Sequence, residues 1–146
     1  MGTLLERVYT FGGKGGNPFS EEPIREIGFS HGDYVDAIFL NGRQHGGNGG
    51  RETSRLVLDA DEYITNLDIR AGRYVDYLRF STNKGRWIAG GGGGGHPSNF
   101  QSIRLLGMSG RTGVYVDYLA LRMMIDADIN PKPSDSSQSR GFNASN

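Results

Sequence analysis

Three aspartates, Asp36, Asp76 and Asp117, are the residues of this 146-residue chain whose spacing first suggests chemistry. Each ends a copy of the segment Gly-x-Tyr-Val-Asp, and the copies lie 40 and 41 residues apart. A carboxylate accepts hydrogen bonds from two adjacent hydroxyl groups, and bonds to a charged acceptor are the stronger kind. Glycoside hydrolysis needs two carboxylates flanking one bond, and only the first copy has a second one, Asp33. The pattern therefore favours binding of a hydroxyl-rich ligand over catalysis.

A second glycine-rich element also occurs three times, at residues 12–16, 46–50 and 90–95. Glycine makes up 24 of the 146 residues, more than twice its ordinary share. A run of glycines lacks Cβ atoms, so it can form a bare loop that comes within contact distance of another backbone or a ligand. A flexible linker is the alternative, but linkers are not usually placed at the same point of three repeats. We therefore expect each glycine loop to take part in a site.

Strands must position both elements. Alternating apolar and polar residues at 24–29, 63–69 and 103–106 precede the three Gly-x-Tyr-Val-Asp segments, and similar runs at 34–40, 77–80 and 118–121 follow them. Each unit is thus predicted to be a β-hairpin with the aspartate segment at its bend, and no window has clean helical periodicity. Three units of about 40 residues fit either a β-trefoil or a β-prism. We expect one domain over residues 1–125 and a polar, disordered tail over 126–146.

Composition excludes several functions. Lys and Arg total 16, as do Asp and Glu, so the net charge of zero argues against electrostatic binding of nucleic acid or an anionic membrane. The chain has no cysteine, no apolar run long enough for a transmembrane helix, and no evident signal peptide. The compartment stays open. No metal or other cofactor is expected, since the three histidines do not cluster and the acidic turn at residues 59–62 lacks the spacing of a calcium loop. Trp87 is expected to pack in the core or an interface.

Together these motifs resemble the jacalin-related lectins, and most of all members with three matched mannose sites. The resemblance spans about residues 8–124 and includes the segment at 17–20, His45 and the segment at 82–86. It implies an all-β fold of the β-prism I type, with three four-stranded Greek-key sheets related by pseudo-threefold symmetry. It also implies a non-catalytic carbohydrate-binding protein.

In this family the matching aspartate binds two hydroxyls of mannose, backbone N–H groups just before it complete the site, and the facing glycine loop adds one more. The resemblance implies these carbohydrate-binding residues: Asp33, Tyr34, Val35 and Asp36; Arg73, Tyr74, Val75 and Asp76; Val114, Tyr115, Val116 and Asp117; and the loop glycines Gly16, Gly50 and Gly95. Each tyrosine is also expected to offer a flat face and a hydroxyl beside its site. Which glycine loop faces which aspartate is left open, as is the register of the longer third run.

The expected partners follow from the number of sites. Three weak sites on one face would bind a branched high-mannose glycan with avidity, such as those on viral or microbial surface glycoproteins. The continuous chain favours mannose or glucose, because galactose-preferring members of the family depend on a cut chain. No nucleic acid and no membrane insertion are expected, and a homodimer is left open. The alternative function is a β-prism scaffold or oligomerisation module that binds no sugar.

Overall fold

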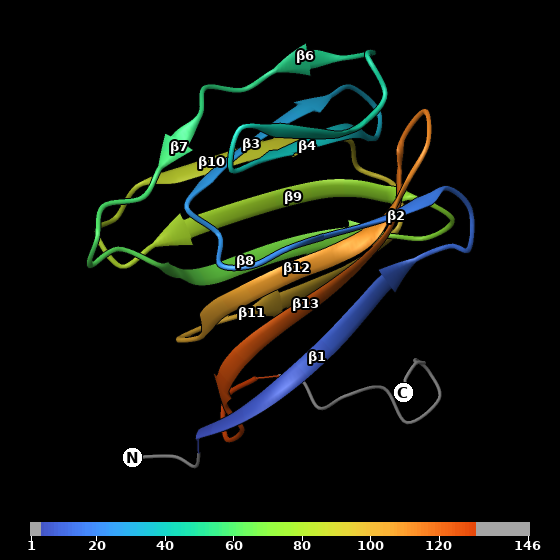
Figure 1. The fold of residues 1–146 in the computed structure, drawn as a ribbon. Helices are drawn as coiled ribbons and strands as arrows, with labels where there is room; N and C mark the ends of the chain where they lie inside the picture. The colour runs from blue at the N-terminus through green and yellow to red at the C-terminus, as the bar shows by residue number, and fades with distance from the viewer. Residues whose placement is uncertain (1–3, 131–146) are drawn as a thin grey trace.

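The computed structural model describes residues 4–130, which form thirteen β-strands in three antiparallel sheets (Figure 1). No helix in this range could cross a membrane. The first sheet has the order β1-β13-β12-β2 and is built from the two ends of the chain. Its strands are β1 (Leu4–Gly12), β2 (Asn17–Glu21), β12 (Arg104–Thr112) and β13 (Val116–Asp126).

The other two sheets are each built from one continuous stretch of chain. The second has the order β5-β4-β3-β6, and its strands are β3 (Glu26–His31), β4 (Val35–Leu40), β5 (Arg43–Gly46), β6 (Arg51–Glu52) and β7 (Leu56–Val57). The third has the order β10-β9-β8-β11, and its strands are β8 (Ile64–Ala71), β9 (Val75–Thr82), β10 (Trp87–Gly91) and β11 (His96–Phe100).

All three sheets share one connectivity, a Greek key in which the fourth strand returns beside the first. In the first sheet β12 and β13 act as strands one and two, and β1 and β2 act as strands three and four, so this unit is circularly permuted. In the second sheet β6 and β7 both pair with β3, so that the fourth strand is interrupted. The prediction of three Greek-key sheets in a β-prism is confirmed, with five strands rather than four in that sheet.

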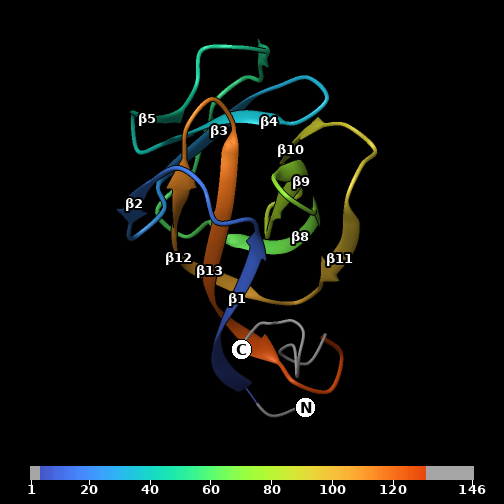
Figure 2. The ribbon, with the colours of Figure 1, turned by 90° about the vertical axis from the view of Figure 1, so that its right-hand side faces the viewer.

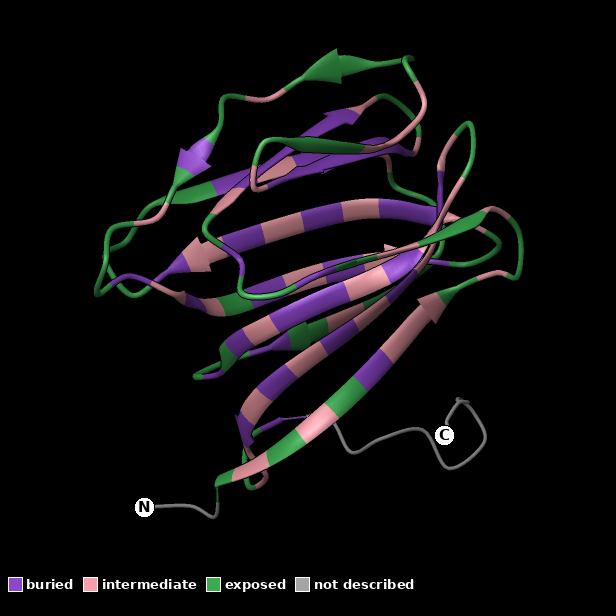
Figure 3. Ribbon diagram, viewed as in Figure 1, coloured by how far each residue is buried: buried purple, intermediate pink, exposed green. Residues whose placement is uncertain are grey.

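The expected alternation is clear along most of β8, β9 and β13, where buried residues alternate with residues of intermediate burial (Figure 3). β4 differs, because all six of its residues are buried. The chain beyond β6 folds over the outer face of this sheet, and the guanidinium of Arg55 lies 3.9 Å from the ring centroid of Phe39. This cover explains why an alternating pattern in the sequence becomes a fully buried strand.

The core joins the three sheets through large apolar side chains. Phe29 of the second sheet meets Phe80 of the third with ring centroids 5.6 Å apart, and Tyr9 of the first meets Phe100 of the third at 4.7 Å. Burial of such side chains stabilises the fold by about 25 cal/mol for each Å² of apolar surface removed from contact with water. Because these contacts join residues of different sheets, no unit can make this core alone.

A buried carboxylate ties the first sheet to the second. Glu21 in β2 accepts hydrogen bonds from the guanidinium of Arg43 at 2.6 and 2.7 Å, and it lies 2.8 Å from Nε2 of His45. The His45 ring stacks on Phe19, with centroids 4.4 Å apart. Hydrogen bonds from Arg43 are the main reason that the pKa of Glu21 falls to about 2. His45, which carried part of the family resemblance, thus holds two sheets together.

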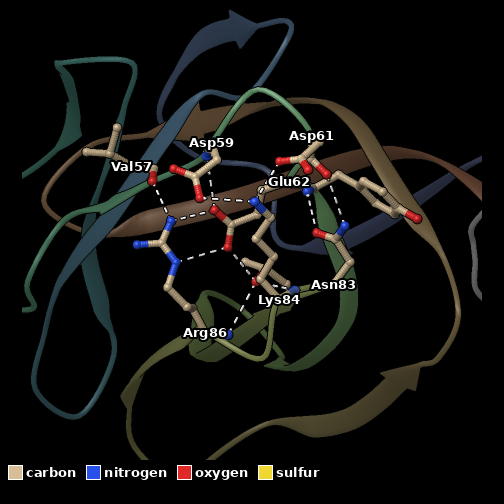
Figure 4. A network of polar contacts seen from close by, with 9 residues as sticks. Val57, Asp59, Asp61, Glu62, Asn83, Lys84 and Arg86 are labelled. Atoms are coloured by element: carbon tan, nitrogen blue, oxygen red, sulfur yellow. Dashed lines mark hydrogen bonds and ion pairs between the residues drawn. The ribbon is translucent and has the colours of Figure 1, made fainter.

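The acidic turn at residues 59–62 has partners at the end of the molecule opposite the hairpin bends that carry the aspartates (Figures 1 and 4). Glu62 is buried and accepts hydrogen bonds from the Arg86 guanidinium, the Thr82 hydroxyl at 2.7 Å and the Asp59 backbone N–H at 3.0 Å. Asp61 pairs with Lys84 at 2.6 Å. These carboxylates therefore anchor the turn between β9 and β10.

Two further expectations concern the periphery. Trp87 is not a core residue, because 56% of it is exposed and its ring packs against the Arg79 guanidinium at 4.2 Å. Of the expected tail, residues 127–130 form a turn after β13, and Asn130 accepts a hydrogen bond from the Gln101 backbone N–H at 2.7 Å. Residues 131–146 lie outside the described part of the chain.

We predict that Glu62→Gln destabilises the fold at neutral pH and not in strong acid. Hydrogen bonds from Arg86 hold the pKa of Glu62 at about 2, below its unfolded value of about 4.3. The native state thus binds fewer protons, and this stabilisation is present above pH 4.3 and lost as the pH falls towards 2. Denaturant unfolding should show a loss of about 1–3 kcal/mol at pH 7.

The matched control is Asp61→Asn, in the same turn, because its carboxylate is mostly exposed and pairs only with Lys84 and should matter little. A Glu62→Gln deficit of equal size at pH 7 and pH 2.5 would contradict this account.

Candidate functional site

The three aspartate segments lie at one end of the molecule, at the bends between β3 and β4, β8 and β9, and β12 and β13. This end is on the right of Figure 1 and faces the viewer in Figure 2. The bends have one conformation: the N–H of the glycine donates to the carbonyl of the tyrosine two residues later. The three distances are all 2.9 Å, for Gly32 to Tyr34, Gly72 to Tyr74 and Gly113 to Tyr115. A register shift just before each bend widens the turn.

The structure assigns one glycine loop to each aspartate. Each loop connects strands three and four of the Greek key whose first two strands carry the aspartate. A backbone N–H of the loop donates to the carbonyl of that aspartate: Gly47 to Asp36 at 3.0 Å, Gly92 to Asp76 at 2.8 Å and Gly13 to Asp117 at 2.7 Å. The first loop in the sequence therefore serves the last aspartate, because the first sheet is circularly permuted.

The last two glycines of each loop lie against the carboxylate itself. At the Asp76 site, a Cβ atom on Gly94 would lie 2.7 Å from Oδ2, and one on Gly95 would lie 2.6 Å from Oδ1. Corresponding distances at the other two sites, for Gly49, Gly50, Gly15 and Gly16, are 2.6–2.9 Å. Gly95 also has a positive φ of 75°, which L side chains rarely adopt. Glycine is needed here both for space and for backbone conformation.

The longer third glycine run resolves into a loop and one extra residue. Gly91 to Gly95 match the five-residue loops, because Gly91 has a positive φ like Gly12 and Gly46, and Gly95 has one like the last glycine of each other loop. Gly90 has a different reason: a Cβ there would lie 2.3 Å from the His31 ring. His31 thus packs between two units.

Each of the three aspartates is nearly buried, with 6–9% of the residue exposed. Burial raises the pKa of Asp36, opposed by the nearby His31, and it raises the pKa of Asp76, opposed by the nearby Arg70. Such a carboxylate is partly desolvated and has both oxygens beside backbone glycines. It is therefore positioned to accept hydrogen bonds from hydroxyl groups of a ligand.

The tyrosines are arranged differently from the expectation. Instead of standing one beside each site, the rings of Tyr34, Tyr74 and Tyr115 pack on one another, with centroids 4.8–5.2 Å apart. Contacts between aromatic rings of this kind stabilise by about 0.5–1.5 kcal/mol each beyond burial. The cluster lies where the three bends converge, so it fixes the three sites relative to one another.

The other expected residues take two distinct positions. The side chains of Val35, Val75 and Val116 are fully buried in the core, so that only their backbone groups could reach a ligand. The residues before each tyrosine are exposed: Asp33, Arg73 and Val114. Within residues 4–130 no group of three or more His, Asp or Glu side chains could hold a metal ion.

Sequence reasoning missed the side chains that hold the glycine loops. Arg70 donates to the carbonyls of Gly94 and Gly95 at 3.0 and 3.1 Å, and Arg111 donates to those of Gly15 and Gly16 at 3.3 and 2.7 Å. At the loop of the Asp36 site the Ser30 hydroxyl donates to the Gly49 carbonyl at 2.7 Å. All three residues stand two positions before the glycine of their bend. That shared position in the repeat was the available signal.

We predict that Gly94→Ala destabilises the protein and Gly93→Ala does not. The added methyl group at Gly94 would meet the Asp76 carboxylate at 2.7 Å, whereas nothing lies within 4 Å of a Cβ on Gly93. Overpacking of this kind costs about 1–3 kcal/mol, and an unstrained Gly→Ala change is neutral or stabilising. Urea unfolding of the two neighbouring variants measures the difference. Equal stability of the two would show that the loop does not press on the carboxylate.

Known proteins are similar to this chain. The Jacalin-like lectin domain matches residues 8–121. Griffithsin from Griffithsia sp. (strain Q66D336) is 38% identical over 110 residues, which cover 75% of this chain and 89% of that protein. Jacalin-related lectin 19 of Arabidopsis thaliana is 28% identical and covers 80% of this chain and 78% of its own length.

Solved structures agree on the fold. Malaysian banana lectin superposes with a TM-score of 0.70 at 24% identity, covering 84% of this chain and 98% of its own. A mannose-binding jacalin-related lectin from Ananas comosus does so with a TM-score of 0.67 at 21% identity, covering 84% and 98%. Because the family's domain matches most of this chain, the chain belongs to the jacalin-like lectin family.

Proposed function

We propose that this protein is a mannose-type lectin that binds the terminal hexoses of high-mannose glycans at three sites on one face, without catalysis. The proposal rests on one observation: the same pairing of a nearly buried aspartate with two close glycines occurs at Asp36, Asp76 and Asp117. At each site the carboxylate would accept from two adjacent ring hydroxyls, while backbone N–H groups of the bend and of the last loop glycine would donate to sugar oxygens.

Mannose is favoured over galactose by the residues of the chain and by its relatives. The bends are intact segments of a continuous chain, whereas the galactose-preferring members of the family depend on a cut at the site. Among the proteins with this fold, those from Ananas comosus and Champedak are named as mannose-binding. Those names support the sugar class.

The common face makes a branched glycan the expected partner. The tyrosine cluster brings the three bends together, so that several branches of one glycan can bind at once. Linked binding events raise affinity by about 10²–10⁴ without new contacts. High-mannose glycans on viral or microbial surface glycoproteins offer such branches. A homodimer would double the number of sites.

Two other functions predict different behaviour. A glycosidase would need a second carboxylate at each site, and the exposed Asp33 provides one at the first bend alone. Release of reducing ends from mannan would support that function. A scaffold without sugar binding would give no heat with any hexose, yet it has no need of three glycine loops fitted against carboxylates.

We predict that isothermal titration with methyl α-mannoside gives three sites per chain. Each substitution among Asp36→Asn, Asp76→Asn and Asp117→Asn should remove one site, because a neutral amide loses the charged acceptor while keeping its shape. The matched control is Asp128→Asn, which makes the same chemical change at an exposed residue in the turn after β13 and should leave three sites.

A branched oligomannoside provides the second arm. It should bind the unaltered chain at least 100-fold more tightly than the monosaccharide, and this gain should vanish in each double variant that keeps one aspartate. A full complement of bound methyl α-mannoside in the variant lacking all three aspartates would overturn the proposal.

Binding should also weaken in acid above the ordinary titration range of aspartate. The ionised carboxylate is the acceptor, and burial raises the pKa of Asp36 and of Asp76 above the usual value of about 3.9. Affinity is thus expected to be constant at neutral pH and to fall as the pH drops through these raised values. Titrations of double variants that keep Asp36 or Asp76 alone measure the midpoint. Unchanged affinity at pH 3.5 would contradict this role for the carboxylates.

A further inference from the structure

The three sites share their centre and differ in their rims. Three exposed positions border each site: the middle residue of the glycine loop, the residue before the tyrosine of the site's own bend, and the matching residue of a neighbouring bend. The middle loop residues are Lys14, Asn48 and Gly93. A threefold arrangement of identical binding groups thus carries three different sets of side chains at its edge.

The neighbouring residue is brought in by close packing between units. A Cβ on Gly13 would lie 2.3 Å from the carbonyl oxygen of Arg73, so the loop of the Asp117 site presses against the bend that holds Asp76. The same contact joins Gly47 to Val114 at the Asp36 site and Gly92 to Asp33 at the Asp76 site, at 2.3 and 2.4 Å. The contacts run round the threefold axis, and every loop meets the bend of another unit.

The rims therefore differ in charge. The Asp117 site is bordered by Lys14 and Arg73, and its own bend contributes the neutral Val114. The Asp76 site has a glycine in mid-loop, the neighbouring Asp33 and its own Arg73. The Asp36 site has Asn48, the neighbouring Val114 and its own Asp33. Only the Asp117 site combines two positive charges with no negative charge on its rim.

Nothing in the described structure neutralises this pair. Lys14 and Arg73 are both exposed, and neither makes an ion pair with any of residues 4–130. Arg111 adds a third positive charge beneath the same loop, where it donates to Gly15 and Gly16. Exposed cations without protein partners remain available to an anion on the ligand.

We propose that the Asp117 site selects a hexose that carries an anionic group, such as a phosphate, with Lys14 and Arg73 as its specificity-determining residues. This inference rests on the proposed function, since the hexose must first bind through the carboxylate. The aspartate itself repels an anion, but all three sites contain it, so the repulsion cancels in a comparison between sites. The chain is then a lectin with one charge-selective site and two sites for neutral sugar.

The probes are α-mannose 1-phosphate and methyl α-mannoside, which have the same free ring hydroxyls and differ at the anomeric oxygen. Each is titrated into Asp36→Asn/Asp76→Asn, which keeps the Asp117 site, and into Asp76→Asn/Asp117→Asn, which keeps the Asp36 site. The preference is the ratio of phosphate affinity to methyl glycoside affinity in one chain, and at low salt it should be about 3- to 10-fold larger in the first chain than in the second. The preference should shrink in 0.5 M salt because exposed charges are screened.

Matched variants exchange the rims. Adding Lys14→Asn and Arg73→Val to the first chain gives the Asp117 site the loop residue and the neighbouring-bend residue found at the Asp36 site, and should remove the excess in this ratio. Adding Asn48→Lys and Val114→Arg to the second chain should raise its ratio, and the Asp33 carboxylate that stays on this rim should keep the ratio below that of the first chain. Because Lys14 and Asn48 are loop-tip residues and all four positions are exposed, folding should be unaffected.

The outcomes separate the two proposals. Equal ratios of phosphate affinity to methyl α-mannoside affinity in the two chains would overturn the rim inference alone. So would equally tight binding of inorganic phosphate without sugar. Failure of every single-site chain to bind methyl α-mannoside would instead overturn the proposed function beneath it.

Discussion

The close approach of a glycine backbone to a nearly buried aspartate carboxylate is the constraint on which the rest of this structure depends. A single Cβ at either of the last two positions of a glycine loop would come within 2.6–2.9 Å of a carboxylate oxygen. Strands one and two of each Greek key must therefore present the aspartate at the place where strands three and four bring the loop. The same requirement explains six of the chain's 24 glycines, which are Gly15, Gly16, Gly49, Gly50, Gly94 and Gly95.

The packing of units around the axis turns three such pairs into one face. Tyr34, Tyr74 and Tyr115 meet at the centre, and every glycine loop presses on the bend of another unit. No unit completes its surroundings alone. Away from the sites, the network around Glu62 holds two turns together, and the link from Glu21 to Arg43 holds the first sheet to the second. The identity of each rim is thereby set by two units together.

Much of this could be predicted from local sequence, because the signals were repeated. Alternating strands, hairpin bends and the three aspartates depend on short-range pattern, and the family resemblance supplied the prism. The pairing of the first glycine loop with Asp117 could not be predicted from sequence order, because it follows from β1 and β2 completing a sheet begun by β12 and β13. The tyrosine cluster was also hidden, since it depends on contacts across units. Arg70 and Arg111 each hold a loop of their own unit, and only their shared position in the repeat pointed to that role.

The most direct test of the central claim is a crystal structure of the protein soaked with methyl α-mannoside. The account predicts three hexoses on one face, each with two adjacent hydroxyls on Asp36, Asp76 or Asp117 and a ring or hydroxyl oxygen near the backbone N–H of Gly50, Gly95 or Gly16. Hexoses bound elsewhere on the molecule, with the three carboxylates facing only water, would contradict it.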